Sequence, residues 1–318
     1  MNRQNYNPLN DYLFKFIFGR DERKRITLSF LNAVLDREGE ETLTDITFID
    51  REIDPQFEDD KLSQLDIYGI ASDGSQINIE VQLVNLYNMQ KRTLYYWARM
   101  YQTLRKGAEY QDLSPSITIN LLNFQMLPQE SPHNMYGIYD IASGHRLTDD
   151  LEIHFLEIPK FKIKSVREMK RLEKWLAYFS NKLNERETEE LAMSEAAINE
   201  AIQAERIFMQ SDVERWQYEQ REKAMRDYLS AMSFCSREGH RQGLEEGRRE
   251  GHRQGLEEGR REGRREGWRE GRREGRREGM LDMARSLLAL NVPVDVIEKS
   301  SGMTRAEILE LQAQIEYT

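Results

Sequence analysis

Residues 65–83 of the chain read LDIYGIASDGSQINIEVQL. An alternating pattern lies on both sides of an Asp-Gly pair, as expected for two β-strands joined by a tight turn. On the second strand Ile77 and Ile79 share one face, whereas Glu80 and Gln82 share the other. The stretch therefore predicts a β-hairpin with one apolar face and one face that carries carboxylates.

The register of this hairpin decides whether its carboxylates meet. A two-residue turn at the Asp-Gly pair would mix polar with apolar side chains on both faces, because a shift of one residue moves every side chain to the other face. A three-residue turn with Gly74 in the left-handed conformation keeps the faces separate. In that register Ile67 faces Ile79. Asp66 then lies beside Glu80, and this is the arrangement that we expect.

Two interpretations of the polar face are open. Asp66, Glu80 and Gln82 together offer oxygen ligands of the kind that a hard divalent cation such as Mg²⁺ prefers. The same alternation is typical of any sheet face exposed to water, so a solvated outer face explains the pattern without a metal.

The sequence also resembles a known family of nucleases. Asp66, thirteen residues and then Glu80-Val81-Gln82 resemble the PD-(D/E)XK nuclease signature in its Asp…Glu-x-Gln form. Three blocks in order resemble the recombination-promoting nuclease / transposase family of that superfamily. They are NPLNDYLFKFIFG at residues 7–19, IEVQ at residues 79–82, and then Arg92, Tyr95, Tyr96, Gly107 and Tyr110. The similarity covers roughly residues 5–235.

The resemblance implies a metal-dependent DNA endonuclease that promotes DNA recombination in a transposase-like manner. Asp66, Glu80 and Gln82 would be its catalytic residues. Asp66 and Glu80 would hold Mg²⁺ or another divalent cation, which would activate a water and neutralise charge on the scissile phosphate. The third position of the signature is usually lysine. Gln82 can orient a water or a phosphate oxygen, but it carries no charge.

Residues 7–35 predict two helices beside the sheet. The first would be capped by Asn10 or Asp11 and would end at Gly19, and the second would run from about residue 22 to residue 35. In a fold of the resembled kind, a helix in this place sometimes adds an acidic residue to the site. Asp11 is the candidate for this accessory acid, and a simple capping role for Asp11 is the alternative.

Residues 87–106 predict a helix with basic and aromatic side chains. Lys91 and Arg92 are interleaved there with Tyr95 and Tyr96. Such side chains can hold a nucleic-acid backbone and stack on bases, so these four are candidate DNA contacts. Arg92 sits one helical turn from Tyr96, where it could clamp a phosphate near the metal. A core helix with a solvated basic edge explains the same pattern.

The composition limits the class of protein. The chain has 318 residues, of which 32% are charged, and its net charge is −10. Proteins that bind nucleic acid are often basic, so any DNA contact must depend on local basic clusters. The single cysteine, Cys235, excludes an internal disulfide framework. The sequence shows neither a signal-peptide pattern nor an apolar run of about 20 residues, so we expect a cytoplasmic protein with no membrane segment.

Glycine occupies every fourth position from Gly239 to Gly279, in a low-complexity repeat rich in arginine and glutamate. Each glycine inside a helix costs about 1 kcal/mol relative to alanine, which argues against an isolated stable helix. Glycines four residues apart do allow two helices to approach closely, although the stripe drifts by about 40° per repeat. We interpret the segment as a charged spacer or as an arm through which the chain forms a homo-oligomer.

The domain organisation that we expect has three parts. Residues 1–235 would form a nuclease-like domain with C-terminal helices, residues 236–279 the charged repeat, and residues 280–318 a small helical tail. Thr304 and Glu307 form the pattern of a capping box in that tail. We interpret the tail as a protein-contact module, and a helix-turn-helix that reads DNA is the alternative.

The expected fold is of the α/β class, a PD-(D/E)XK-like mixed sheet flanked by helices. Further strands are predicted at residues 43–49, 116–124, 135–141 and 151–158, and helices in residues 166–233. Two functions fit the chain. One is a Mg²⁺-dependent DNA endonuclease. The other is a catalytically weak or inactive nuclease-fold protein that acts as an oligomerising interaction scaffold, which Gln82 and the net acidity favour.

Overall fold

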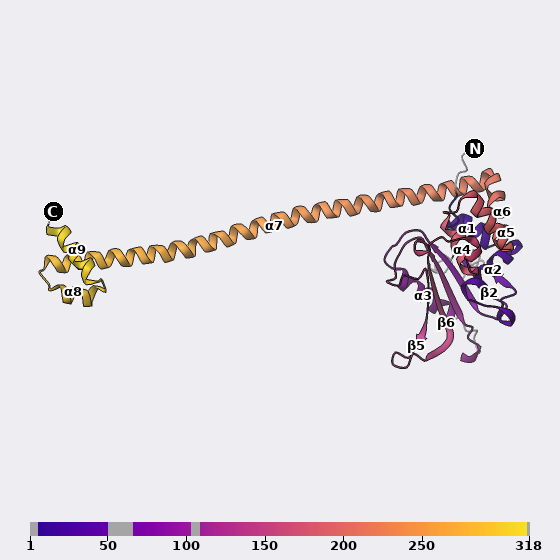
Figure 1. Cartoon of the computed structure of the whole chain (residues 1–318), viewed down its shortest axis with the longest axis horizontal. Coiled ribbons are helices and arrows are strands. Elements are labelled where there is room, and N and C mark those ends of the chain that lie inside the picture. Colours follow the sequence, from indigo (N-terminus) through magenta and orange to yellow (C-terminus); the bar gives the residue numbers. More distant parts are fainter. Residues whose placement is uncertain (1–5, 50–65, 103–108, 317–318) are drawn as a thin grey trace. The chain divides into compact units, whose positions relative to one another are not determined.

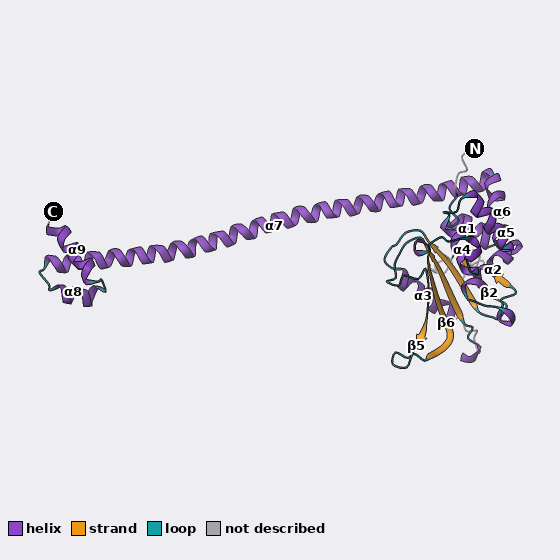
Figure 2. Ribbon diagram, viewed as in Figure 1, coloured by secondary structure: helices purple, strands orange, loops and turns teal. Residues whose placement is uncertain are grey.

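A computed structural model describes residues 6–49, 66–102 and 109–316. The chain divides into two units, residues 1–228 and 229–318. The first unit holds a six-stranded sheet with helices on both faces, and the second holds most of a long helix and the helices that follow it (Figures 1 and 2). The expected α/β class with a mixed sheet flanked by helices is confirmed.

The sheet is mixed. Its strands are β1 (Ile46–Phe48), β2 (Ile67–Ala71), β3 (Gln76–Gln82), β4 (Ser116–Leu122), β5 (His133–Tyr139) and β6 (Arg146–Glu157). They lie in the order β1-β2-β3-β4-β6-β5, with β3, β4 and β6 parallel and the other pairs antiparallel. The last strand begins earlier than the predicted residue 151, because Arg146 already pairs with Tyr139 across the hairpin.

The helices occur largely where the apolar periodicity places them. They are α1 (Asp11–Phe18), α2 (Lys24–Val34), α3 (Met89–Tyr101), α4 (Arg171–Ser180), α5 (Glu185–Ser194), α6 (Ala196–Gln210), α7 (Asp212–Ala289), α8 (Val294–Ser301) and α9 (Arg305–Glu316). Asn10 caps α1, since its side chain accepts hydrogen bonds from the amides of Tyr12 and Leu13. The helix predicted over residues 87–106 is described as far as Tyr101, and residues 103–106 lie outside the described residues.

The hairpin of β2 and β3 has the expected register. Gly74 has a φ of +84°, and the amide of Ala71 donates to the carbonyl of Ser75 at 2.9 Å, so the turn has three residues. Ile67 lies opposite Ile79. The two-residue turn is excluded. In this register the side chains of the hairpin alternate between the two faces of the sheet. A different layer of helices covers each face.

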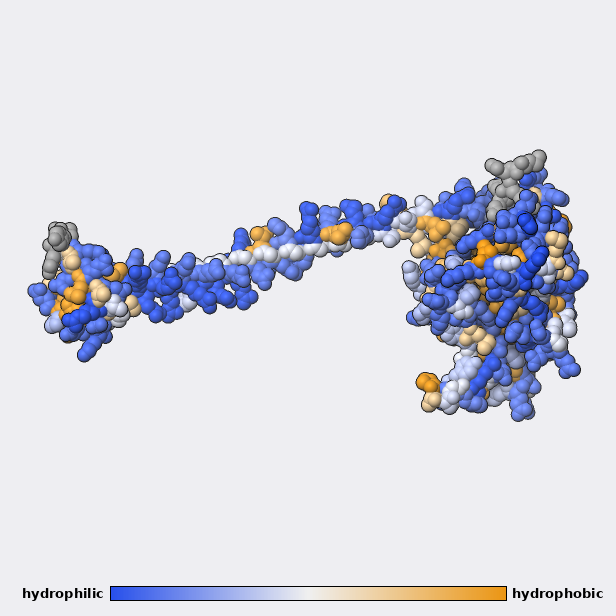
Figure 3. Space-filling model, viewed as in Figure 1, coloured by the Kyte–Doolittle hydropathy of each residue, from blue (hydrophilic) through white to orange (hydrophobic). Residues whose placement is uncertain are grey.

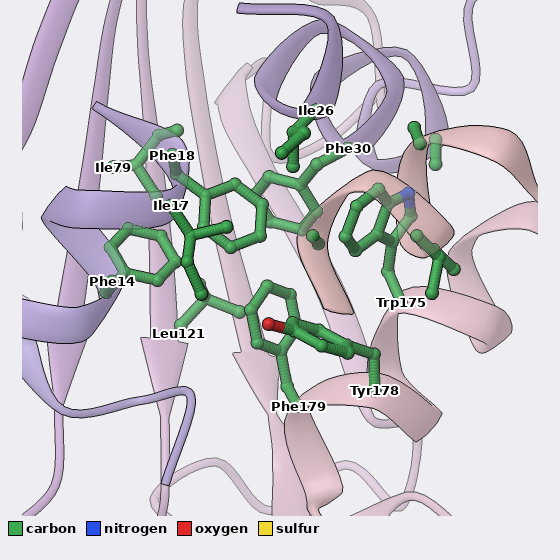
Figure 4. Packing of buried hydrophobic residues seen from close by; sticks show 14 of the residues in the cluster. Phe14, Ile17, Phe18, Ile26, Phe30, Ile79, Leu121, Trp175, Tyr178 and Phe179 are labelled. Atoms are coloured by element: carbon green, nitrogen blue, oxygen red, sulfur yellow. The ribbon is translucent and has the colours of Figure 1, made fainter. Parts of the chain in front are cut away.

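The main core fills the space between one face of the sheet and α1, α2, α4, α5 and α6. An aromatic cluster from three of these helices packs against Ile79 and Leu121 of the sheet (Figure 4). Its rings, with centroids 4.6 to 6.1 Å apart, belong to Phe14, Phe18, Phe30, Trp175 and Phe179. Burial of these large apolar rings stabilises this unit.

The other face of the sheet lies under α3. The polar side chains of β3 that point to this face are buried, with Gln76 exposed by 6% and both Asn78 and Glu80 by 1%. Tyr96 and Met100 of α3 form a buried cluster with Tyr68 of β2. The interpretation of this polar face as a solvated surface is therefore wrong, because α3 covers it.

The glycine repeat lies within α7, one continuous helix of 78 residues. The expectation that the glycines argue against a stable helix is not met. The residues between the glycines are strong helix formers, and the helix only has to extend from ends that are already packed, which avoids the cost of nucleation. Ion pairs along the surface, such as Glu250 with Arg253, add a few tenths of a kcal/mol each. The surface of the repeat is mostly hydrophilic (Figure 3).

The end of α7 packs with α8 and α9 around a small core of Ala284, Ile297, Ile308 and Leu311. Gly302 ends α8 in the left-handed conformation with a φ of +70°. The predicted capping box is present at the start of α9, where the amide of Thr304 donates to Glu307 at 2.9 Å. Among the described residues, no helix combines the length and apolar character that a membrane span requires.

Candidate functional site

The candidate site lies where β2 begins and β3 ends. The amide of Asp66 donates to Glu80 Oε1 at 3.4 Å, and the amide of Val81 donates to Asp66 Oδ2 at 2.8 Å. The register of the hairpin thus brings the two carboxylates side by side, as the sequence predicts. Because β3, β4 and β6 run parallel, the pair lies at the carboxyl end of the parallel strands, where ligands bind in open α/β sheets.

Two cations from opposite helix layers approach this pair. Lys15 of α1 places Nζ 3.8 Å from Asp66 Oδ1, and Arg92 of α3 donates from a terminal guanidinium nitrogen to Glu80 Oε2 at 2.8 Å. Each of the four carboxylate oxygens therefore has at least one positively polarised neighbour. A carboxylate oxygen has two lone pairs, so the contacts of Asp66 leave its oxygens with capacity for a further ligand.

Burial makes the two carboxyl groups weak acids. Glu80 is 1% exposed, and its burial, followed by the negative charge of Asp66, raises its pKa to about 8. Burial likewise raises the pKa of Asp66 to about 6, although the hydrogen bond from Val81 and the charge of Lys15 oppose this rise. Removal of two charges from water in one place is unfavourable unless cations compensate it, so this is a site that a metal ion would stabilise.

A cleft of about 360 Å³ opens beside the pair. Its lining includes Asp11 of α1, Asp66, Gln82 at the end of β3, and Arg221 from the first turns of α7. Asp11 pairs with Arg221 at 3.8 Å, and its charge contributes to the raised pKa of Asp66. Since Asn10 performs the capping of α1, Asp11 is left to face this cleft. Glu80 does not line the cleft, although its neighbour Val81 does.

Helix α3 divides its basic and aromatic residues between two faces. Arg92 and Tyr96 face the sheet: Arg92 Nε donates to the hydroxyl of Tyr96 at 3.1 Å, and Tyr96 is 4% exposed. A ring so buried has no face free to stack on a base, and its contact with Arg92 orients the guanidinium. Lys91 and Tyr95 are exposed. The structure therefore brings Arg92 to the carboxylates and leaves Lys91 and Tyr95 on the outer surface.

Lys15 is the site residue that sequence reasoning missed. It follows Asp11 by four residues, so the two share a face of α1. This spacing lies within the block at residues 7–19, and it is the sequence feature that could have indicated Lys15 as a site residue. Its neighbours Phe14, Phe16 and Ile17 are buried, whereas Lys15 is half-buried. From the sequence alone, a lysine between such apolar positions is expected to be solvated. Its carboxylate partner, Asp66, is 51 residues away in the chain and could not be inferred from its neighbours.

The residues present fit a divalent cation. Asp66 and Glu80 supply hard oxygen donors, and Mg²⁺ commonly binds through one or two carboxylates and keeps several waters. Among the described residues, no group of three or more His, Cys, Asp or Glu side chains surrounds one point. A metal bound here would therefore have ligands from water or substrate as well as from the two carboxylates.

The raised pKa values predict that the metal-free protein loses stability as the pH rises. Between the ordinary pKa of 4.5 and about 8, Glu80 keeps a proton in the folded state that the unfolded chain has lost. The free energy of unfolding therefore falls across this interval. The titration of Asp66 lowers it further, up to about pH 6. Glu80→Gln removes this titration. Its melting temperature in EDTA should rise relative to wild type as the pH increases toward 8.

Glu152 of β6 provides the matched control. Burial acts to raise its pKa, but hydrogen bonds from His154 and Arg146 outweigh burial and hold the pKa below its ordinary value. Glu152→Gln should therefore lower the melting temperature at neutral pH, with a smaller effect in acid. A melting temperature of Glu80→Gln that stays parallel to wild type at every pH would contradict the buried-pair account.

A family model described as PD-(D/E)XK nuclease family transposase matches residues 8–234. The match spans well over half of the chain and includes α1, the hairpin and α3. No curated protein and no solved structure matches the chain significantly. The family match agrees with a mixed sheet that carries two adjacent carboxylates at the end of its central hairpin. The chain belongs to the PD-(D/E)XK nuclease family transposases.

Proposed function

We propose that the protein is a Mg²⁺-dependent DNA endonuclease whose site is built around Asp66 and Glu80. The observation that carries this proposal is the buried carboxylate pair at the end of β3, with a raised pKa at both members. Family membership supports a nuclease that acts on DNA and supports a role in transposase-like recombination. The cleft beside Asp66 and Gln82 offers room for a phosphate group and its water.

The reaction is the hydrolysis of a phosphodiester. Water adds to phosphorus, and the bond from phosphorus to one sugar oxygen breaks. One proton of the water ends on that oxygen, and the other stays on the new phosphate monoester or passes to solvent. A bound Mg²⁺ would lower the pKa of the water and neutralise charge on the phosphate.

The residues of the chain hold and orient the reactants. Asp66 and Glu80 would bind the metal, and Gln82, which lines the cleft, would orient the water or a phosphate oxygen through its amide. Asp11 would serve as an accessory acid through water, since it lines the same cleft. Arg92 would hold a phosphate oxygen with the guanidinium hydrogens that Glu80 and Tyr96 leave free.

The outer face of α3 is the proposed DNA contact. Lys91 and Tyr95 are exposed and lie one helical turn apart. The ammonium of Lys91 would pair with a phosphate, and the ring of Tyr95, 42% exposed, would stack on an unpaired base. Because the net charge of the chain is −10, this local contact must overcome a general repulsion from DNA.

A second proposal concerns self-association. Among the described residues, a Cβ added at any glycine from Gly239 to Gly279 would meet no atom within 4 Å beyond its chain neighbours and the nearby backbone of its own helix, so no other described part of the chain covers the stripe. Eleven glycines in a helix cost on the order of 10 kcal/mol relative to alanine, and surface ion pairs offset only part of that. Contact with the repeat of a second copy would supply stabilisation that a lone helix lacks. This favours a homo-oligomer, which would also suit an interaction scaffold.

The nuclease proposal predicts that the wild-type protein nicks supercoiled plasmid in Mg²⁺ and not in EDTA. Asp66→Asn and Glu80→Gln should each lower the nicking rate by at least about a hundredfold, since each removes a metal ligand. The measurement is the rate of conversion to open-circular DNA on a gel, with folding checked by near-ultraviolet circular dichroism.

Glu152→Gln is again the matched control, because Glu152 is a partly buried carboxylate that pairs with an arginine, as Glu80 does, on another strand of the sheet. It should nick at the wild-type rate. Equal rates for wild type, Asp66→Asn and Glu80→Gln would reject the nuclease and leave the scaffold function.

The proposed contact on α3 predicts different effects of charge and of stacking. Lys91→Gln should weaken the binding of a fluorescent duplex and lower the slope of log Kd against log salt by about 1. Tyr95→Ala should weaken binding to a single strand without any change in that slope, because stacking involves no counterion. Fluorescence anisotropy in EDTA measures both. Lys162→Gln, at an exposed lysine between β6 and α4, should behave as wild type; an equal effect there would reject the contact.

Self-association predicts sedimentation that depends on concentration. Gly255→Leu with Gly259→Leu should weaken association, because leucine prevents the close approach of two helices. Gln254→Leu with Glu258→Leu adds the same apolar groups beside the stripe and should leave association intact. A wild-type protein that sediments as a monomer at every concentration would disprove a homo-oligomer.

A further inference from the structure

The site has no ammonium group at the third position of the nuclease signature. Gln82 stands where the nuclease signature usually has lysine, and an amide cannot neutralise the charge that develops on a phosphate. We propose that Lys15, on α1, supplies the ammonium that Gln82 lacks. The inference rests on the proposed nuclease function and adds a catalytic residue to it.

Lys15 is well placed for this role. The Asn10 cap and the buried residues on both sides of Lys15 anchor the backbone of α1 where this side chain begins. The side chain is 39% exposed, and its Nζ lies 3.8 Å from Asp66 Oδ1, beyond the length of a strong hydrogen bond. The ammonium is therefore near the proposed metal ligand but held loosely enough to turn toward a substrate oxygen.

The other nearby cations are less available. Arg92 is held at 2.8 Å by Glu80 and at 3.1 Å by the hydroxyl of Tyr96, so part of its hydrogen-bonding capacity is already used to compensate Glu80. Arg221 pairs with Asp11 rather than with either hairpin carboxylate, and its side chain is 60% exposed. Among the described residues, Lys15 forms an ion pair with Asp66, the carboxylate that lines the cleft, although Lys15 itself is not part of that lining.

In the reaction, the ammonium of Lys15 stays protonated. It donates to a non-bridging oxygen of the scissile phosphate, where negative charge accumulates as water adds to phosphorus. No proton is transferred through Lys15, so the balance of the hydrolysis is unchanged. A metal held by Asp66 would supply the positive charge beside that carboxylate, which would leave the ammonium of Lys15 available to a substrate oxygen.

The test compares two lysines in similar settings. Lys24 of α2 pairs with Asp45 and is 33% exposed, close to the 39% of Lys15, yet it is not in contact with the hairpin carboxylates. Lys15→Met should slow plasmid nicking by about a hundredfold, the typical loss when one stabilising donor is removed from a transition state. Lys24→Met should nick at the wild-type rate.

Metal binding gives a second readout that does not depend on cleavage. Removal of a positive charge near Asp66 lowers the repulsion felt by a cation, so calorimetric titration with Mn²⁺ should give a Kd for Lys15→Met equal to or below that of wild type. If Lys15 only held Asp66 in position, the same substitution would weaken Mn²⁺ binding. Weakened Mn²⁺ binding by Lys15→Met would overturn the catalytic role.

A rescue variant makes the test specific. Gln82→Lys in the Lys15→Met background returns an ammonium to the usual position, and nicking should recover at least tenfold. Recovery would support the proposal that Lys15 replaces the lysine that is usual at the position of Gln82. Wild-type nicking that Lys15→Met leaves unchanged would overturn this inference alone, whereas absence of nicking by the wild type would overturn the proposed function and this inference together.

Discussion

The burial of two carboxylates side by side is the constraint on which the rest of the site depends. Asp66 and Glu80 lie within hydrogen-bond reach of each other's strand, and neither is well hydrated. Two negative charges so placed repel each other and lose the stabilisation that water would give. One cation from each layer of helices compensates this repulsion: Lys15 from α1 and Arg92 from α3. The protein thus keeps an electrostatically unfavourable pair at the place where a divalent cation would be most stabilising.

The architecture serves to keep that pair in position. The three-residue turn at Gly74 fixes the register, and the register alone decides that Asp66 and Glu80 share a face. The aromatic core anchors α1 against one side of the sheet, while α3 closes the other side. A sheet whose polar face were open to water would leave both carboxylates with ordinary acidity, so the covering helix is as important to the site as the strands are.

Much of this organisation follows from local sequence. The alternation in residues 65–83 and the glycine of the turn predict the hairpin, its register and the meeting of Asp66 with Glu80, because these depend on neighbouring residues. The burial of the polar face could not be predicted in this way, since it depends on how α3 docks. Lys15 was missed for the same reason: its partner Asp66 is far away in the sequence. Helix propensity was misleading in the repeat, where the glycines do not interrupt α7, since extension from packed ends avoids the cost of nucleation.

The proposed role of Asp66 and Glu80 is to bind a divalent metal between them. The most direct measurement is the anomalous scattering of Mn²⁺ in crystals of the protein. If the pair binds the metal, one strong peak should lie within about 2.1 Å of a carboxylate oxygen from both Asp66 and Glu80. That peak should be lost in crystals of Asp66→Asn. Density for Mn²⁺ elsewhere, or none between these two side chains at saturating Mn²⁺, would show that Asp66 and Glu80 are not the metal ligands.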